Sequence, residues 1–418
     1  MGNLKIKASV FINYLLFGIM LNSVGTVILQ VQRYYGVTES SASILEAFKD
    51  ITIAVVSFLV ASFITRIGYK KSMQIGLTAV AIACFLVPSV KTFIAIKLLF
   101  AVTGASFALT KISVFGSIGL ITKGEKEHIS FMNFLESFFM VGILMGYFIF
   151  SYFIDDADAS SGRWFHIYYF IGGLYLLALL LLSSAPLNES EAKPAELLKA
   201  EQSFSDMLKL LVLPLVVSFV ICAFLYVLIE QSIMSWLPTF NNKVLHLPSS
   251  FSVLMAGIMA ASTAIGRFLA GIILKKISWH IALTTCLIAA ACLVLIALPL
   301  AKAESSHQIK VWADVPFSAY IFPLIGFFLA PVYPAVNSVI LAALPKEKHG
   351  AMSGLIVVFS ALGGSLGSLI TGYIFQHYGG QTAFYFSLVP LTLLTIALFI
   401  FKRTRSAASF YKENNASK

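Results

Sequence analysis

The chain contains twelve apolar stretches, each about long enough to cross a lipid bilayer as a helix, and this feature constrains the fold most strongly. The stretches are too long and too continuous for the alternating strands of a membrane barrel, which have about ten residues each. Irregular backbone cannot face lipid. We therefore predict an all-α integral membrane protein. The predicted spans are Ser9–Leu29, Ile44–Ile64, Met73–Val90, Phe93–Ile121, Ile129–Phe153, Ile167–Leu182, Leu210–Leu237, Phe251–Leu274, Ile281–Leu300, Phe317–Leu344, Ala351–Ile374 and Phe384–Phe401.

Composition and charge agree with a membrane location and argue against nucleic-acid binding. Hydrophobic residues make up 59% of the chain and charged residues only 11%, whereas soluble domains carry roughly a quarter charged residues. The net charge is +10, but of the 29 Lys and Arg residues 19 would lie on the side of the amino terminus, six on the opposite side and four within spans. The positive-inside rule then predicts that both termini are cytoplasmic. We expect a multi-pass protein of a bacterial inner membrane.

The second half of the chain repeats the first. A shift of 221 positions carries His128 onto His349, Gly142 onto Gly363 and Gly146 onto Gly367. An internal repeat of six spans is a common construction of secondary transporters, with the two copies related by an axis along the membrane normal. We predict an amino-terminal six-helix bundle over residues 1–187, a cytoplasmic linker over 188–209, a carboxy-terminal six-helix bundle over 210–402, and a basic cytoplasmic tail over 403–418.

The turn between the second and third spans resembles a signature of the major facilitator superfamily. That signature places Gly, Asp, Arg, Gly and a basic residue at fixed spacing, and the matching segment here runs from Ala61 to Lys71, with Thr65 in place of the Asp. A partial second copy contains Gly266, Arg267 and Gly271. The resemblance implies an alternating-access transporter and makes gating candidates of Arg66, Lys70 and Arg267.

A narrower resemblance points to fucose permease and related sugar symporters. The residues that carry it are Tyr226, Val227, Glu230, Ser232, Ser235, Trp236 and Leu237 in the seventh span, and Leu329, Ala330, Pro331, Pro334 and Ser338 in the tenth. The acids that fucose permease has in its first and fourth spans are absent, since Gly25 and Leu109 occupy the corresponding positions. The resemblance implies a sugar as substrate and protons as the coupling ion.

Charged residues inside spans are the main candidates for function, because each costs about 2.5 to 3.5 kcal/mol to insert at the centre of a helix. Such residues normally face a wet cavity or a charged partner. The eight candidates are Glu46, Lys49, Asp50, Lys97, Lys111, Glu136, Glu230 and Arg267. The counterparts of Glu136 and Lys111 in the repeat are Val357 and Val332, so the buried charges of the fourth and fifth spans belong to the first copy alone.

Three carboxylates are candidates for proton coupling. Glu136 would pair with Arg267 or Lys111 while the inner side is closed, and its protonation would weaken that closure; alternatively, Lys111 and Glu136 form a permanent ion pair. Glu46, Lys49 and Asp50 share one flank of the second span at spacings of three and four residues. They form either a self-neutralising cluster or an outer gate and proton entry point.

The candidate substrate contacts combine a carboxylate, amides, a cation and an aromatic ring, which suit the hydroxyls and apolar face of a sugar. They are Glu230, Gln231, Trp236, Asn22, Asn133, Asn337 and Lys111. For Glu230 the alternative is a hydrogen bond in helix packing, and each Asn could instead bond a neighbouring helix. No metal site, cofactor site or enzymatic nucleophile is evident.

We therefore predict a monomeric secondary transporter that moves a small polar solute, such as a sugar, by proton-coupled symport through the lipid bilayer. Sodium is the alternative coupling ion. A proton-coupled exporter of drugs or metabolites is the rival of the same class, and the 36 Phe and 16 Tyr residues are consistent with its aromatic cavity. A membrane sensor that transports nothing is the rival of a different class.

Overall fold

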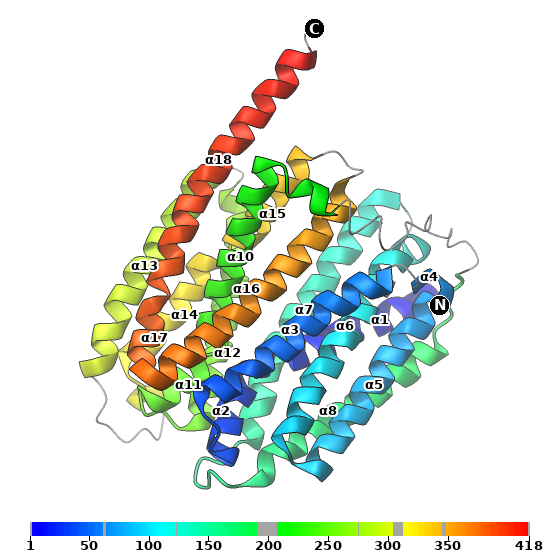
Figure 1. The fold of residues 1–418 in the computed structure, drawn as a ribbon. Coiled ribbons are helices and arrows are strands. Elements are labelled where there is room, and N and C mark those ends of the chain that lie inside the picture. Colours follow the sequence, from blue (N-terminus) through cyan, green and yellow to red (C-terminus); the bar gives the residue numbers. More distant parts are fainter. Residues whose placement is uncertain are drawn as a thin grey trace. The chain divides into compact units, whose positions relative to one another are not determined.

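A computed structural model describes residues 2–61, 64–122, 124–189, 207–274, 276–303, 312–344 and 348–416, and within these residues every regular element is a helix (Figure 1). In the first half of the chain the helices are α1 (Gly2–Asn22), α2 (Val24–Tyr35), α3 (Glu39–Ala61), α4 (Ile64–Ile67), α5 (Tyr69–Val90), α6 (Phe93–Ile121), α7 (Gly124–Phe153), η1 (Gly162–Phe165) and α8 (His166–Ser184). In the second half they are α10 (Pro214–Met234), α11 (Leu237–Lys243), α12 (Ser249–Ile273), α13 (Trp279–Ala303), η2 (Trp312–Asp314), α14 (Phe317–Leu329), α15 (Val332–Ala343), α16 (His349–Tyr378), α17 (Gly380–Phe386) and α18 (Leu388–Ala416).

The chain divides into two compact units. Unit 1 contains Met1–Ala200 and Ser249–Gly257, and unit 2 contains Glu201–Pro248 and Ile258–Lys418. Most of the predicted linker, residues 190–206, lies outside the described residues. The predicted linker boundaries therefore stay a prediction.

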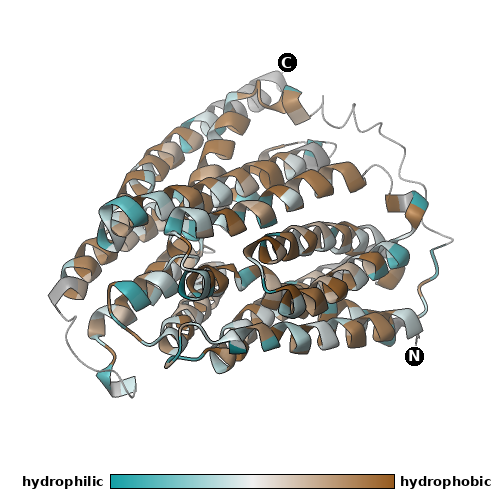
Figure 2. Cartoon of the chain, turned by 60° about the horizontal axis from the view of Figure 1, so that its bottom comes forward, coloured by the Kyte–Doolittle hydropathy of each residue, from teal (hydrophilic) through white to brown (hydrophobic). Residues whose placement is uncertain are grey.

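Eleven helices of the described residues are long and apolar enough to span a membrane. The twelfth span is α3, which is long enough but more highly charged than the other eleven. Every stretch of 18 residues within it contains Glu46, Lys49 and Asp50. Figure 2 shows hydrophobic residues along the helices and hydrophilic residues mainly at helix ends and in connecting segments. The prediction of a twelve-helix membrane protein is confirmed.

Two predicted spans are interrupted. The first, predicted as one helix over Ser9–Leu29, breaks at Ser23 between α1 and α2. The predicted span is present, and the break within it coincides with side chains that bond the backbone: the Ser23 hydroxyl donates to the oxygen of Met20 at 2.7 Å and the Asn22 amide donates to that of Gly18 at 3.2 Å. The tenth span breaks at Pro331 between α14 and α15, because proline interrupts the hydrogen bonds of a helix.

The same helix pairings recur in both units. In unit 1, α1 packs against α7, α6 and α8, and α5 packs against α6 and α8. In unit 2 the repeat counterpart of α1 is α10, which packs against α16, α15 and α18, while α13 packs against α14 and α18. Equivalent elements therefore occupy equivalent positions, as the sequence repeat predicts.

Glycines that match in the repeat bring two helix pairs into close contact. A Cβ at Gly142 of α7 would collide with the backbone oxygen of Leu15 in α1, and a Cβ at Gly363 of α16 would collide with that of Phe224 in α10. Gly367 makes the same kind of approach to the oxygen of Leu228. These glycines therefore allow the backbones of the paired helices to approach closely.

Candidate functional site

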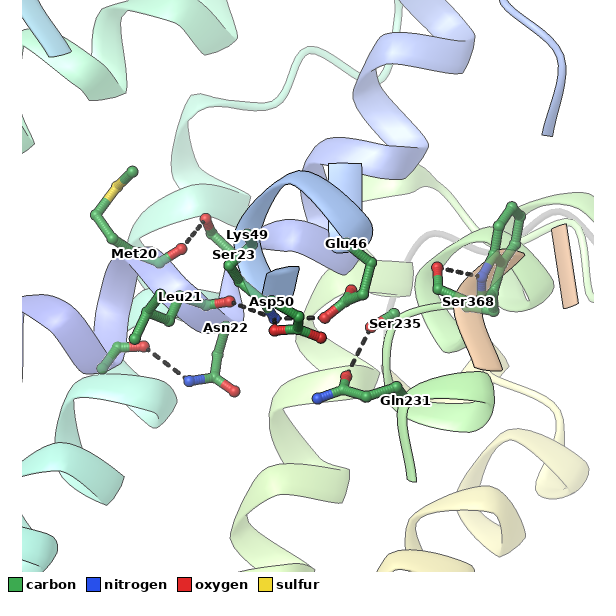
Figure 3. A network of polar contacts seen from close by, with 12 residues as sticks. Met20, Leu21, Asn22, Ser23, Glu46, Lys49, Asp50, Gln231, Ser235 and Ser368 are labelled. Carbon is green, nitrogen blue, oxygen red and sulfur yellow. Dashed lines mark hydrogen bonds and ion pairs between the residues drawn. The ribbon is translucent and has the colours of Figure 1, made fainter. Parts of the chain in front are cut away.

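Glu46, Lys49 and Asp50 of α3 form a buried charge cluster (Figure 3). The Lys49 ammonium forms an ion pair with Glu46 Oε1 and lies 3.4 Å from Asp50 Oδ1. Spacings of three and four residues place these side chains on one flank of a helix, as predicted. The Glu46 side chain has no exposed surface, and the Lys49 ammonium contributes to the compensation of its buried charge. With two carboxylates and one ammonium, the cluster has one excess acidic group.

The cluster also contacts the break in the first span. Lys49 Nζ donates a hydrogen bond to the backbone oxygen of Leu21, 3.4 Å away, one residue before the end of α1 (Figure 3). Backbone oxygens inside a membrane need a partner because no water is available there. The ammonium is thus shared by two carboxylates and one carbonyl.

A second group of charges lies between α1, α6 and α7 of the same unit. The Glu136 carboxylate acts electrostatically on both Lys111 and Tyr14, so the three side chains are near one another. The Lys111 ammonium lies 5.7 Å from the centre of the Phe107 ring and 5.8 Å from that of Phe115. Among the described residues, neither Glu136 nor Lys111 forms an ion pair, so this conformation does not contain the permanent pair considered above.

Glu230 is the centre of a polar cluster in unit 2. Its Oε1 atom accepts a hydrogen bond from the Tyr226 hydroxyl at 2.8 Å and lies 3.4 Å from Arg267 Nη2. Both contacts use Oε1, and Oε2 accepts no hydrogen bond from any residue that the structure describes. The side chains of Glu230 and Arg267 are 18% and 37% exposed, so both remain accessible.

Tyr333 and Ser360 extend this cluster, and the sequence analysis missed both. The Tyr333 ring stacks on that of Tyr226, with centroids 5.4 Å apart and planes 22° apart. The hydroxyls of Tyr333 and Ser360 are hydrogen-bonded at 2.8 Å. Asn337 lies one helical turn after Tyr333, and its Oδ1 is buried without a partner among the described atoms. The sequence could have indicated Tyr333, because a spacing of four residues places it on the same helix face as Asn337, which was predicted to contact the solute.

Three other predicted substrate contacts have partners within their own unit. The fully buried Trp236 donates its indole N–H to Ser368 Oγ at 3.1 Å and packs against Phe375, so it has a packing role in this conformation. Gln231 Oε1 accepts the Ser235 hydroxyl at 3.0 Å (Figure 3), and Asn22 bonds within α1. The side chain of Asn133 lies outside the described part of the structure.

The gating candidates Lys70 and Arg267 each have partners within their own unit. Lys70 donates to the backbone oxygens of Ser183 and Ala185 at the end of α8, at 3.0 and 2.7 Å. The backbone N–H groups of Tyr69 and Lys70 donate to the Glu189 carboxylate at 3.0 and 2.7 Å. A carboxylate thus caps the start of α5 and a cation caps the end of α8, which is the favourable arrangement for both helix dipoles. Arg66 is exposed, and Arg267 belongs to the Glu230 cluster.

The loop after α7 holds three carboxylates with distinct partners. Asp155 accepts the backbone N–H groups of Ala157 and Asp158, at 3.1 and 3.2 Å. Asp158 accepts both the hydroxyl and the N–H of Ser160, and these bonds lower the pKa of Asp158 from its ordinary value. Asp156 accepts hydrogen bonds from the backbone N–H and the hydroxyl of Ser250. The described residues contain no group of three or more His, Cys, Asp or Glu side chains that could hold a metal ion.

Comparison with known proteins gives one family. The family model described as Major Facilitator Superfamily matches residues 10–318 and 310–416. Two proteins described as Protein TsgA homolog are each 22% identical to this chain. The one from Buchnera aphidicola subsp. Schizaphis graminum aligns over 97% of this chain and 98% of its own, and the one from Buchnera aphidicola subsp. Baizongia pistaciae over 94% of each.

Solved structures share the fold. A bacterial homologue of the human lysosomal transporter Spinster, in an inward-facing and occupied conformation, has a TM-score of 0.76 at 15% identity and covers 96% of both chains. A D-xylose–proton symporter has a TM-score of 0.72 at 14% identity, with 96% of this chain and 98% of that chain covered. The transporter FucP in its outward conformation has a TM-score of 0.61 at 16% identity, with 97% and 99% covered.

Proposed function

The chain belongs to the Major Facilitator Superfamily of membrane transporters, and on that premise we propose that it moves a small polar solute, such as a sugar, by proton-coupled symport. Alternating access would expose the solute site first to one side of the membrane and then to the other. In this proposal the protein is a monomer of a bacterial inner membrane with both termini in the cytoplasm.

The Glu230 cluster would supply the solute contacts of unit 2. The observation that carries this proposal is the accessible Oε2 atom of Glu230, which accepts no hydrogen bond from any described residue, while Oε1 is held by Tyr226 and Arg267. A positioned carboxylate oxygen without a donor is suited to a solute hydroxyl. Asn337 Oδ1 offers a second acceptor, and the ring of Tyr333 offers an apolar face.

The excess acidic group of the Glu46–Lys49–Asp50 cluster would carry the coupling proton. A buried carboxylate without a cation is costly unless it is protonated, and Lys49 can compensate only one of the two. We assign the exchangeable proton to Asp50, because Glu46 forms the closer contact with the ammonium. Glu136 is the alternative coupling residue, since it is exposed and has Lys111 nearby.

The rival function, a proton-coupled exporter of aromatic or amphipathic compounds, is favoured by a specific group of rings in unit 1. Phe107 lies within 6.1 Å of Tyr14 and 5.7 Å of Phe139, centre to centre, and Phe11 stacks on Phe138 at 4.9 Å. Aromatic rings bind flat apolar ligands where a face is accessible, and in this group the Phe138 ring is exposed whereas Tyr14 and Phe107 are buried. In the sugar proposal the solute contacts the Glu230 cluster of unit 2, whereas in the exporter it would contact the aromatic rings of unit 1.

A solute screen with purified protein in lipid vesicles tests the proposal. Labelled sugars, nucleosides and amphipathic drugs would be offered with a pH gradient, without one, and with a sodium gradient as control. We expect accumulation of a polar solute that depends on the pH gradient and is weakened by Glu230→Gln but not by Asp158→Asn, a matched change in the loop after α7. Binding without flux would identify a sensor, and drug export would identify the rival transporter.

The coupling residue can be tested separately. Asp50→Asn should preserve the exchange of labelled for unlabelled solute across the vesicle membrane while it abolishes accumulation driven by the pH gradient. Glu136→Gln should accumulate solute normally. If Glu136→Gln loses accumulation and Asp50→Asn keeps it, the coupling proton belongs to Glu136 instead.

A further inference from the structure

Helix α12 is the only described helix that is divided between the two units. Its first nine residues, Ser249–Gly257, group with unit 1, whereas the rest of the helix groups with unit 2. By its place in the repeat, α12 is the second span of the second six-helix set. Ser249–Gly257 therefore groups with unit 1, although the rest of the same helix belongs to unit 2.

Asp156, in the loop after α7, caps the start of this segment. One carboxylate oxygen accepts the backbone N–H of Ser250 at 3.0 Å, and the other accepts the hydroxyl of the same residue. The residue at the N-cap position is Pro248, whose side chain offers no acceptor to the N–H of Ser250. Asp156 supplies that acceptor from a distant part of the chain, and its negative charge is favourable at a helix N-terminus.

A second contact holds the same segment two turns further along. A Cβ added to Gly257 would lie 3.0 Å from Cβ of Tyr147, so α12 packs directly on this side chain of α7. Tyr147 is buried and lies within the electrostatic influence of Glu46 and Lys49. The Asp156 cap and the Tyr147 contact together fix both ends of Ser249–Gly257.

We propose that the hydrogen bonds between Asp156 and Ser250 are a latch, closed in this conformation, that opens in every transport cycle to release Ser249–Gly257 from unit 1. The latch follows the fifth span, so it lies on the side of the membrane opposite the amino terminus, which the charge distribution predicts to be outside. Both hydrogen bonds are exposed to solvent, so they can exchange for bonds to water at modest cost. The proposal rests on the alternating-access function proposed above.

Labelling of a buried cysteine tests the latch without any measurement of transport. Ser252 is fully buried within the segment, so Ser252→Cys should react slowly with a membrane-impermeant maleimide while the latch is closed. The chain used would have its four native cysteines replaced by alanine. Addition of Asp156→Ala, which removes both acceptor oxygens, should increase the labelling rate by about two- to thirty-fold, the range expected for loss of a helix cap. Asp158→Ala is the matched control and should leave the rate unchanged, because the hydrogen bonds of the Asp158 side chain among the described residues stay within its own loop.

A reversible cross-link tests whether the latch has to open. The pair Asp156→Cys and Ser250→Cys should form a disulfide under mild oxidation, stop solute flux, and regain flux on reduction. A cross-linked protein that still transports, or equal labelling rates in Asp156→Ala and Asp158→Ala, would overturn the proposal. If labelling depends on Asp156 but no solute is transported by the unmodified protein, the contact between Asp156 and Ser250 holds the segment, whereas the proposed function fails and the opening in a transport cycle fails with it.

Discussion

The Lys49 ammonium lies 3.4 Å from the backbone oxygen of Leu21, where the first span is interrupted between α1 and α2. The same ammonium contacts Glu46 and Asp50, so one cation connects the charges of α3 to the backbone of α1. Because the three acceptors compete for one group, a change in the charge of either carboxylate alters the bond to Leu21. The cluster can in this way connect protonation with the geometry of the broken helix.

Removal of the Lys49 charge should strongly destabilise the protein. In Lys49→Met two buried carboxylates lose their cation, and the loss of one partner of a buried ion pair costs about 3 to 5 kcal/mol. Thermal unfolding in detergent would measure the change. The double variant Lys49→Met, Glu46→Gln should lose less stability than Lys49→Met, since only one carboxylate then remains. If the single variant is as stable as the wild type, the cluster is not held together by its charges.

The contact between α1 and α7 should tolerate no side chain at Gly142. A methyl group there would collide with the backbone of α1, so Gly142→Ala should cost about 1 to 3 kcal/mol in the free energy of unfolding. Gly173 of α8 is the matched control, because a Cβ there meets nothing within 4 Å. We expect Gly173→Ala to be neutral or to stabilise the helix by up to about 1 kcal/mol. Equal effects at the two positions would mean that α1 and α7 can separate without loss.

The cap on α5 should slow amide exchange at its first residues. In Glu189→Ala the N–H groups of Tyr69 and Lys70 lose their acceptor, and loss of a helix cap costs about 0.5 to 2 kcal/mol. Hydrogen–deuterium exchange of the peptide that contains both amides should therefore become faster by about two- to thirty-fold. Lys71→Ala, at an exposed neighbouring position, should leave the exchange rate unchanged. Unchanged exchange in Glu189→Ala would show that the cap contributes nothing.

Tyr226 should position Glu230 for the solute. Tyr226→Phe removes the 2.8 Å hydrogen bond to Oε1, so the carboxylate becomes less ordered. A loss of about 1 kcal/mol in solute binding would raise KM about fivefold. Tyr175→Phe is the control, because this equally buried hydroxyl has no partner among the described residues. A rise in KM for Tyr175→Phe equal to that for Tyr226→Phe would indicate a general effect of hydroxyl removal instead.

Much of the architecture could be predicted because it depends on local and periodic properties of the chain. Hydropathy located the spans, and matches such as Gly142 with Gly363 identified the duplication. Spacings of three and four residues along one helix predicted that Glu46, Lys49 and Asp50 lie together. These predictions hold because one helix fixes the relative positions of its own residues.

Contacts between different helices could not be predicted in this way. The tertiary structure decided that Arg267 contacts Glu230, that Lys49 bonds the oxygen of Leu21, and that Asp156 caps α12. The sequence alone determined a duplicated membrane transporter fold and the residues whose burial requires a partner. Which partner each residue has depends on the rotation and tilt of packed helices, and distant parts of the chain determine these together.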